Sequence, residues 1–349
     1  MSDKQYDFGV FIGRFQPFHK GHLQVVLAAL EQCRNLVILL GSANRGRDTR
    51  NPFTASERAA VIADCLEEAG VLERCEIADL PDHPYDMQAW IAGVQSAVKD
   101  CTHPDSKIAL TGHDRDNSSF YLKKFPNWAF IMPTTDLVEI NATAIRTAFF
   151  NGDLTEEFEP KLLSWLPEPS LRFLKTFRER DEWFPISTEQ YRERKYREQW
   201  GKGPFMTADA VVIQSGHLLV VERGGDIGKG KLALPGGHLN VDETLDQAAV
   251  RELFEETELF GDCQSVEEAA NKLWPHFRGR EMFDDVYRSP RARVITTAFL
   301  FKLPDAFVLP RVKGSDDAAR AFWMPVGDIK PELFFEDHYF VIERMKRYL

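Results

Sequence analysis

The order of apolar and polar positions divides the chain into two halves with different patterns. In the first half, short apolar runs predict strands at 6–13, 35–43, 75–80, 107–112 and 128–134. Apolar residues with helical spacing predict intervening helices at 21–33, 51–70, 86–100 and 143–153. Thr54 and Glu57 have the spacing of a capping box, and Gly70 suits the end of the helix they begin. This alternation predicts a parallel sheet flanked by helices.

The second half starts with a break in this rhythm. Residues 155–204 are rich in Pro, Trp, Arg and Glu, and we interpret them as a helical connector. After it, the pattern predicts two strands within 208–224, joined by a hairpin turn at Ser215-Gly216. One helix at about 244–258 and strands at 293–303 and 321–326 complete a mixed sheet. We therefore predict an α/β protein with domains at 1–154 and 205–349.

Composition narrows the class of protein. The chain has 349 residues, 44% of them hydrophobic and 28% charged, which is typical of a globular protein of about two domains. The net charge of −11 disfavours general nucleic-acid binding but allows a local basic pocket for a small anion. No apolar run suits a membrane span or a signal core, so we expect a cytoplasmic protein with no membrane partner. The five cysteines lack a CxxC pair, and we expect most of them to be buried thiols.

The string "GRFQPFHKGH" at 13–22 carries the first candidate chemistry. It stands between the first predicted strand and the next helix, where open α/β sheets bind ligands and where the helix N-terminus attracts anions. Gly13 permits close approach of a phosphate, and Arg14 adds a permanent positive charge. His19 and His22 lie three residues apart, so their rings can point the same way. The arrangement suits a nucleoside triphosphate, and a tight turn with two surface histidines is the alternative.

This string resembles the HxGH signature of the adenylyl/cytidylyltransferase superfamily, in the form typical of archaeal-type nicotinamide mononucleotide (NMN) adenylyltransferases. "NPFTASER" at 51–58 and "INATAIR" at 140–146 resemble further motifs of that family, with Asn141 in place of a serine. An asparagine can still cap a helix. The resemblance implies a Rossmann-like nucleotidyltransferase domain in which His19, His22, Arg14 and Arg146 are catalytic. It also implies ATP contacts from Gly13, Phe15, His19, His22, Asn141, Thr143 and Arg146.

Trp90 has two interpretations. The resemblance implies that its ring stacks on the nicotinamide of NMN, whereas its position in a predicted helix equally suits packing against the sheet.

The string "GGHLNVDETLDQAAVRELFEETEL" carries the second candidate chemistry. Thr244 and Gln247 form a capping box, which places Glu252, Glu255 and Glu256 on one face of one helix. These carboxylates repel each other unless a cation lies among them, and Mg²⁺ or Mn²⁺ is the expected ion for oxygen ligands. A solvated acidic helix face is the alternative.

The spacing resembles the Nudix box, GX5EX7REUXEEXGU with U aliphatic. The resemblance implies an α/β/α domain in which Glu252, Glu255, Glu256 and the Gly237 carbonyl bind the metal. Arg251 then orients a glutamate by ion pairing, with support from Glu243. Glu258 stands where the box has its last glycine, so we expect a locally altered turn.

A third stretch, 283–301, resembles "RSxRGRxxTHA" of ADP-ribose pyrophosphatases fused to NMN adenylyltransferases. It implies that Arg288, Arg291 and Arg293 bind ADP-ribose, while a cationic strand surface is the alternative. Ala292 and Thr297 depart from that pattern. Asp316 and Asp317 lie in a predicted loop. They could supply a general base, and surface acids are the alternative interpretation.

Together the two halves predict a bifunctional enzyme of NAD metabolism with the small-molecule substrates ATP, NMN and ADP-ribose. One domain transfers AMP from ATP to NMN, and the other hydrolyses ADP-ribose to AMP and ribose 5-phosphate. The alternatives are a nucleotidyltransferase for another phosphorylated acceptor with a Nudix domain of different specificity, and a nucleotide-sensing regulator with little catalysis. The sequence leaves open the preference for NMN or nicotinate mononucleotide, the metal count and the oligomeric state, a homo-oligomer included.

Overall fold

The computed structural model describes residues 4–112, 121, 123–133, 140–261 and 263–349. The chain divides into two compact units, Met1–Gln190 and Tyr191–Leu349. Thr134, at the end of the last strand predicted in the first half, lies outside the described residues. No helix within the described ranges is long and apolar enough to cross a membrane.

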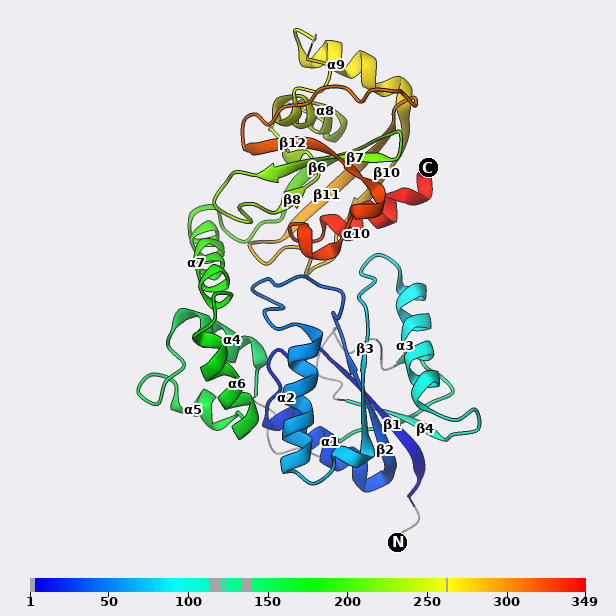
Figure 1. The fold of residues 1–349 in the computed structure, drawn as a ribbon, viewed down its shortest axis with the longest axis vertical. Helices are drawn as coiled ribbons and strands as arrows, with labels where there is room; N and C mark the ends of the chain where they lie inside the picture. The colour runs from blue at the N-terminus through cyan, green and yellow to red at the C-terminus, as the bar shows by residue number, and fades with distance from the viewer. Residues whose placement is uncertain (1–3, 113–120, 122, 134–139, 262) are drawn as a thin grey trace. The chain divides into compact units, whose positions relative to one another are not determined.

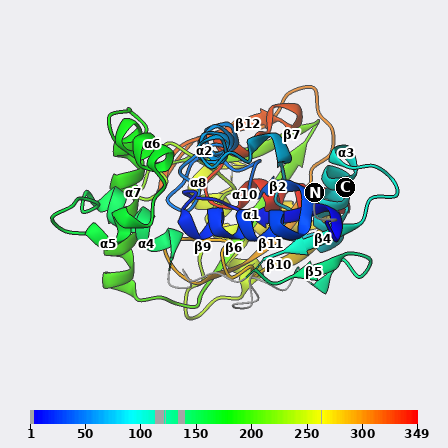
Figure 2. The ribbon, with the colours of Figure 1, turned by 90° about the horizontal axis from the view of Figure 1, so that it is seen from below.

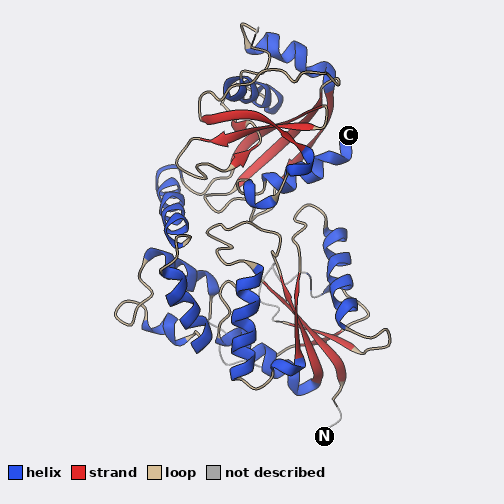
Figure 3. Cartoon of the chain, viewed as in Figure 1, coloured by secondary structure: helices blue, strands red, loops and turns tan. Residues whose placement is uncertain are grey.

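The first unit is built on a parallel sheet in the order β3-β2-β1-β4-β5. Figure 3 shows the strands of both units in red. The strands are β1 (Tyr6–Gly13), β2 (Cys33–Leu40), β3 (Cys75–Asp79), β4 (Ile108–Thr111) and β5 (Ala129–Ile131). Every neighbouring pair runs in the same direction. The predicted parallel sheet is therefore confirmed, and the alternation of strands with helices is the reason for it.

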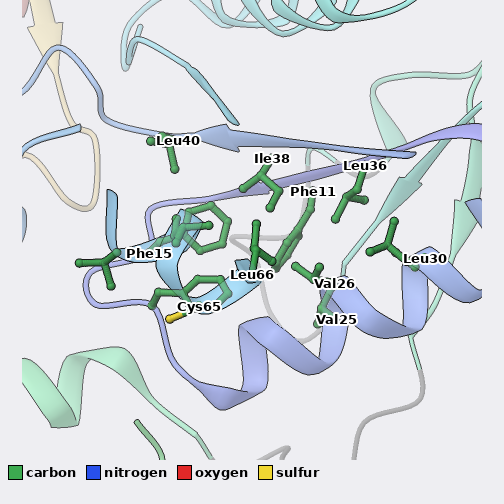
Figure 4. Close-up of a cluster of buried hydrophobic side chains, with 14 residues drawn as sticks. Phe11, Phe15, Val25, Val26, Leu30, Leu36, Ile38, Leu40, Cys65 and Leu66 are labelled. Atoms are coloured by element: carbon green, nitrogen blue, oxygen red, sulfur yellow. The ribbon is translucent and has the colours of Figure 1, made fainter. Parts of the chain in front are cut away.

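Helices cover both faces of this sheet (Figures 1 and 2). The helices α1 (Lys20–Gln32) and α2 (Ala55–Glu68) pack on one face with Phe11 and Leu36, in the core drawn in Figure 4. Helix α3 (Met87–Cys101) packs on the other face with Val10 and Val37. Because successive residues of a strand point to opposite faces, each buried strand serves both cores. The predicted capping box at Thr54 and Glu57 begins α2, and Gly70 follows its end with φ 69°.

Most of the segment that we expected to form a connector packs into the first unit. Helices α5 (Pro160–Ser164), α6 (Glu168–Arg178) and the start of α7 (Trp183–Trp200) share an apolar core with α4 (Ala142–Asn151). Phe177 and Trp183 contact Phe149 and Phe150 there. The domain limits that we placed from the sequence, at 154 and 205, stay predictions.

The second unit holds a seven-stranded mixed sheet whose main path is β10-β11-β6-β7-β12. Its strands are β6 (Phe205–Gln214), β7 (His217–Arg223), β8 (Leu232–Ala233), β9 (Gly236–His238), β10 (Phe277–Phe283), β11 (Val294–Lys302) and β12 (Ala318–Pro325). The strands β6 and β11 pair in parallel, and the other pairs are antiparallel. The predicted hairpin turn at Ser215 and Gly216 is confirmed, since both have a positive φ and join β6 to β7.

Helices again lie on both sides of this sheet. The helices α8 (Leu245–Thr257) and α9 (Val266–Leu273) share a core with Ala210 of β6 and Phe299 of β11. Helix α10 (His338–Met345) lies against β10 and β11 on the opposite side, as Figure 3 shows. The arrangement is the α/β/α architecture that the sequence predicted. Of the five cysteines, Cys33, Cys65 and Cys263 are buried, so the prediction for most of them is confirmed.

Candidate active sites

The first candidate site begins where β1 ends. This strand lies at the centre of its sheet, with β2 and β3 on one side and β4 and β5 on the other. Open α/β sheets bind ligands beyond the carboxyl ends of the strands at such a switch point. The turn after Gly13 leads directly into α1, whose N-cap residue is His19. The histidine motif therefore lies at the position that the sequence predicted.

His19 and His22 cap α1 with their own rings. The Nδ1 atom of each ring accepts a hydrogen bond from the backbone N–H of the other residue, at 3.3 Å in both cases. The rings stack with centroids 3.5 Å apart and planes 16° from parallel, so they lie side by side as predicted. Because Nδ1 is an acceptor in both rings, each neutral ring carries its proton on Nε2. The helix N-terminus thus fixes the tautomer that donates to a ligand from Nε2.

Close packing explains two glycines of this motif. A Cβ atom on Gly13 would lie 2.7 Å from the Phe15 ring, and one on Gly21 would lie 3.2 Å from the His19 ring. The Phe15 side chain is buried and meets the His22 ring edge-on, with centroids 4.9 Å apart. Phe15 therefore belongs to the core that supports the histidines. Only its main chain remains for the ATP contact that the resemblance implies.

Positive charge gathers around the same turn from three segments. Arg146 of α4 is buried and donates from Nη1 to the Gln16 carbonyl oxygen at 2.7 Å. Burial, followed by the positive charges of Arg14 and Arg50, lowers the pKa of Arg146 to about 9. Guanidinium groups that disfavour one another's charge are stabilised when a polyanion binds among them. The cluster therefore suits a triphosphate.

Arg50 is a candidate residue that sequence reasoning missed. A carboxylate network holds its loop: Glu57 accepts from Arg47 at 2.7 and 2.8 Å and from Arg180 at 2.7 Å. Asp48 accepts from the backbone N–H of Arg50 at 2.8 Å. The available signal was the position of Arg50 immediately before the motif at 51–58.

The start of α4 confirms that the asparagine, which stands in place of the serine of the family motif, caps the helix. Asn141 is the N-cap residue, and its side-chain oxygen accepts from the Thr143 backbone N–H at 2.8 Å. The Thr143 hydroxyl accepts from Arg146 Nη2 at 3.2 Å, so the motif also orients the arginine.

Trp90 lies on α3 and is partly buried against the core of the sheet. Its ring meets Tyr121 edge-on at 5.9 Å and Phe125 at 6.4 Å. The packing interpretation therefore has structural support, while stacking on nicotinamide stays a prediction.

The second candidate site lies on α8 and on the loop before it. The predicted capping box of Thr244 and Gln247 is present, and Glu252, Glu255 and Glu256 lie in this helix. Arg251 is the hub of the acidic cluster. It donates to both Glu243 oxygens at 2.6 and 2.9 Å, and its Nη1 donates to Glu252 and Glu255 at 2.9 Å. The predicted pairing of Arg251 with glutamates, and the support from Glu243, are thus present in the structure.

Glu256 lies deeper than the other helix glutamates. The backbone N–H of Gly236 donates to it at 3.0 Å. Burial, opposed by this hydrogen bond and reinforced by the charge of Glu252, raises the pKa of Glu256 to about 8. Burial also raises the pKa of Glu252. A nearby cation stabilises the ionised form of carboxylates that resist ionisation in this way.

The loop glycines make room for these carboxylates. A Cβ atom on Gly237 would overlap the Glu252 carboxylate, and one on Gly236 would overlap Asp209. The resulting donor set of carboxylate oxygens and a glycine carbonyl fits a hard divalent cation. Among the residues that the structure describes, no three His, Cys, Asp or Glu side chains already form a metal cluster. Arg251 binds two of the three helix glutamates instead.

The helix exit corrects one expectation. Glu258 caps α8 in the left-handed conformation, with φ 48° and ψ 28°. This is the conformation that a glycine favours at this position. The turn is therefore the ordinary left-handed one and not an altered turn.

The three predicted ADP-ribose arginines have different surroundings. Arg288 is buried in a two-point ion pair with Asp337, at 2.9 and 3.0 Å, which favours a structural role. Arg293 donates to the Asp285 carbonyl oxygen at 2.9 Å and fixes the loop before β11. Arg291 lies over the Phe335 ring, with Cζ 5.4 Å from the centroid. Of the three, Arg291 has the surroundings that best suit a ligand.

Comparison with known proteins assigns both halves. The Cytidylyltransferase-like family matches residues 10–148, and the NUDIX domain family matches residues 204–345. The nicotinamide/nicotinic acid mononucleotide adenylyltransferase of Acinetobacter baylyi is 36% identical over 197 residues, which cover 56% of this chain and 96% of that protein. The nicotinamide-nucleotide adenylyltransferase of Thermococcus onnurineus is 32% identical over 44% of this chain and 78% of its own.

One similar solved structure spans both halves. It is a bifunctional NMN adenylyltransferase/ADP-ribose pyrophosphatase from Francisella tularensis, complexed with AMP and a manganese ion. The two proteins are 32% identical, with a TM-score of 0.87 over 98% of this chain and 99% of that one. The chain therefore belongs to the family of bifunctional NMN adenylyltransferase/ADP-ribose pyrophosphatases, in which a cytidylyltransferase-like domain and a Nudix domain share one polypeptide.

Proposed function

We propose that this protein joins ATP and NMN into NAD and hydrolyses ADP-ribose, each reaction in its own unit. The relatives that are similar in the first half are NMN adenylyltransferases, and the solved structure that is similar over the whole chain has both activities in its name. The single structural observation that supports the first activity is the stacked, helix-capping histidine pair at the end of a turn that Arg146 binds through the Gln16 carbonyl oxygen.

In adenylyl transfer, an NMN phosphate oxygen attacks the α-phosphorus of ATP. The bond from that phosphorus to the bridging oxygen breaks, and pyrophosphate leaves. His19 and His22 donate from Nε2 to phosphate oxygens, while Arg14 and Arg146 neutralise the charge that develops on the leaving group. No protein nucleophile is required, because alignment and electrostatic stabilisation account for catalysis of this reaction type. Gly13, Asn141 and Thr143 shape the ATP site, and Trp90 is the proposed contact for NMN.

In the second unit, a water molecule is added across the diphosphate of ADP-ribose, which gives AMP and ribose 5-phosphate. Glu252, Glu255, Glu256 and the Gly237 carbonyl would hold a divalent cation. When bound there, such a cation would supply charge neutralisation and activation of the attacking water. Arg251 orients Glu252 and Glu255, and Glu243 holds Arg251 in turn.

Asp316 is the proposed general base. It has a left-handed backbone with φ 53°. Burial raises the pKa of Glu252, and the negative charges of Glu255 and Asp316 reinforce this shift. The preceding residue, Ser315, is tied to α8 because its N–H donates to the Glu256 carbonyl oxygen at 3.3 Å.

Two assays on one preparation test the proposal. With ATP, NMN and Mg²⁺ the protein should form NAD and pyrophosphate, and His19→Ala should abolish this reaction only. With ADP-ribose and Mg²⁺ or Mn²⁺ it should form AMP, and Glu255→Gln with Glu256→Gln should abolish that reaction only. Formation of neither product would contradict the proposal. A panel of phosphorylated acceptors tests the alternative transferase, which no finding favours. The choice of Mg²⁺ over Mn²⁺ and a cytoplasmic location stay predictions.

A further inference from the structure

Two arginines share one aromatic ring in the second unit. The Cζ atom of Arg223, at the end of β7, lies 4.3 Å from the centroid of Phe335, and that of Arg291 lies 5.4 Å from it. Both distances are within the range of a cation–π interaction. Arg291 also has its Cζ atom 5.6 Å from the ring of Tyr196. Two distant segments thus bring two guanidinium groups to one place.

The chain builds a rigid support for this pair. The backbone N–H of Phe335 donates to the Leu232 carbonyl oxygen at 2.8 Å. The Phe335 ring lies against Gly228, where a Cβ atom would overlap it. The next residue, Glu336, accepts from the Ser289 hydroxyl at 2.6 Å and lies 3.4 Å from Arg291 Nε. The ring and one arginine are therefore held by backbone and side-chain contacts, and not by packing alone.

A short segment connects the pair with α8, the helix of the acidic cluster. The Ser315 N–H donates to the Glu256 carbonyl oxygen at 3.3 Å, and Ala318 pairs with Arg223 across β12 and β7. Burial, followed by the positive charge of Arg291, lowers the pKa of Arg223. An aromatic face offsets only part of such repulsion, whereas a phosphate group accepts two hydrogen bonds from a planar guanidinium and carries the opposite charge. The diphosphate of the proposed substrate carries the negative charge and the acceptor oxygens that such a pair would bind.

We propose that Arg223 and Arg291 form a guanidinium pair that binds a phosphate group of the nucleoside diphosphate substrate, and that Phe335 holds the pair in position. This inference rests on the proposed hydrolase activity and adds Arg223 and Phe335 to its site. Arg223 is a substrate-binding residue in this view, while Phe335 is a positioning residue.

The test compares wild type with Arg223→Gln, Arg223→Lys and Phe335→Leu. Arg320→Gln is the matched control, because Arg320 also stacks on a phenylalanine, Phe322 at 4.5 Å, but is exposed and pairs with Glu222. Glu222 precedes Arg223 in β7, and successive strand residues point to opposite faces of the sheet. The measurements are kcat and KM for ADP-ribose with Mg²⁺, and the Kd of ADP-ribose by calorimetry in EDTA. ADP-ribose binding elsewhere on the protein is common to all variants and cancels in the comparison.

We expect Arg223→Gln to raise KM and Kd about 10- to 100-fold, as for loss of charge-assisted hydrogen bonds. Arg223→Lys and Phe335→Leu should raise KM and Kd by about 5- to 10-fold. Lysine keeps the positive charge but loses the planar guanidinium group, and leucine removes the aromatic ring that holds the two arginines. NAD synthesis should stay unchanged in all variants, and Arg320→Gln should behave as wild type.

Distinct results separate failure of this inference from failure of the proposed function. If wild type hydrolyses ADP-ribose and the three variants keep KM and Kd within twofold, the guanidinium pair does not bind substrate. If wild type itself forms no AMP, the hydrolase proposal fails first. If Arg223→Gln does not fold, the Lys and Leu variants decide, and unchanged KM and Kd in both would overturn the proposal.

Discussion

Gly237 offers a sharp test of the second site, because adding one methyl group there perturbs one carboxylate. An alanine Cβ would overlap Oε1, Oε2 and Cδ of Glu252. The carboxylate therefore has to move, and its 2.9 Å hydrogen bond from Arg251 is lost or stretched. The backbone carbonyl of Gly237 is also a proposed metal ligand, so the substitution affects two proposed ligands at once, this carbonyl and the Glu252 carboxylate.

The size of the effect follows from two terms. Forcing an extra methyl group into a packed site typically costs about 1–3 kcal/mol of folding free energy. Displacing a ligand by roughly an ångström, or disturbing the residues that orient it, typically costs about 10- to 100-fold in metal affinity or activity. We therefore expect Gly237→Ala to lower kcat/KM for ADP-ribose by about 100-fold and to raise the Mg²⁺ concentration required for half-maximal rate.

The assay is AMP formation over a Mg²⁺ titration, with NAD synthesis by the first unit as the internal standard. Gly225→Ala is the matched control, because nothing lies within 4 Å of a Cβ atom at Gly225. It should retain wild-type hydrolysis. If Gly237→Ala folds, keeps NAD synthesis and hydrolyses ADP-ribose at the wild-type rate, the placement of Glu252 against this glycine has no part in catalysis.

Three further predictions concern single carboxylates. The folded state raises the pKa of Glu256 from 4.5 to about 8, so its contribution to stability is full below pH 4.5 and is lost as the pH rises through 8. In EDTA, the free energy of unfolding from urea titrations should fall by a few kcal/mol between pH 5 and pH 9, with a slope of up to roughly 1.4 kcal/mol per pH unit. Glu256→Gln should remove most of this slope, and an unchanged slope would contradict the assignment. Glu57→Ala removes the carboxylate that Arg47 and Arg180 share. We therefore expect the free energy of unfolding to fall by about 2 kcal/mol and the KM for ATP to rise, while hydrolysis of ADP-ribose is unaffected. An unchanged KM for ATP would show that this network does not support the ATP site. Glu258 has a left-handed backbone, which glycine adopts easily and a β-branched residue does not. Glu258→Gly should therefore keep or raise the free energy of unfolding, and Glu258→Val should lower it by about 1–2 kcal/mol. A valine variant as stable as wild type would contradict this prediction.

Local signals were sufficient for much of the fold and for the core of both sites. The first strand, the helix caps at Thr54 and Thr244, and the turn at Ser215 lie where the sequence predicted them. Each depends on residues within a few positions of one another. The acidic face of α8 and the side-by-side histidines follow from helical periodicity in the same way.

Contacts between distant segments could not be predicted. Phe15 occurs inside the histidine motif, yet its ring is part of the core. Arg288 pairs with Asp337, 49 residues away, and no local pattern in the sequence indicates this ion pair. Its contact with ADP-ribose stays a prediction. Arg223 gave no signal, because its partner Phe335 lies 112 positions downstream. Side-chain environment depends on which segments the sheet brings together.

The sequence by itself determined the two-part α/β organisation and the motif residues of each site, because periodicity, capping and motif spacing are properties of short stretches of chain. Only the tertiary structure decided which arginines gather at the candidate sites, how buried Glu256 is and what supports Arg291. Those properties depend on burial and on charges from segments far apart in the chain, and they become defined only when the core packs.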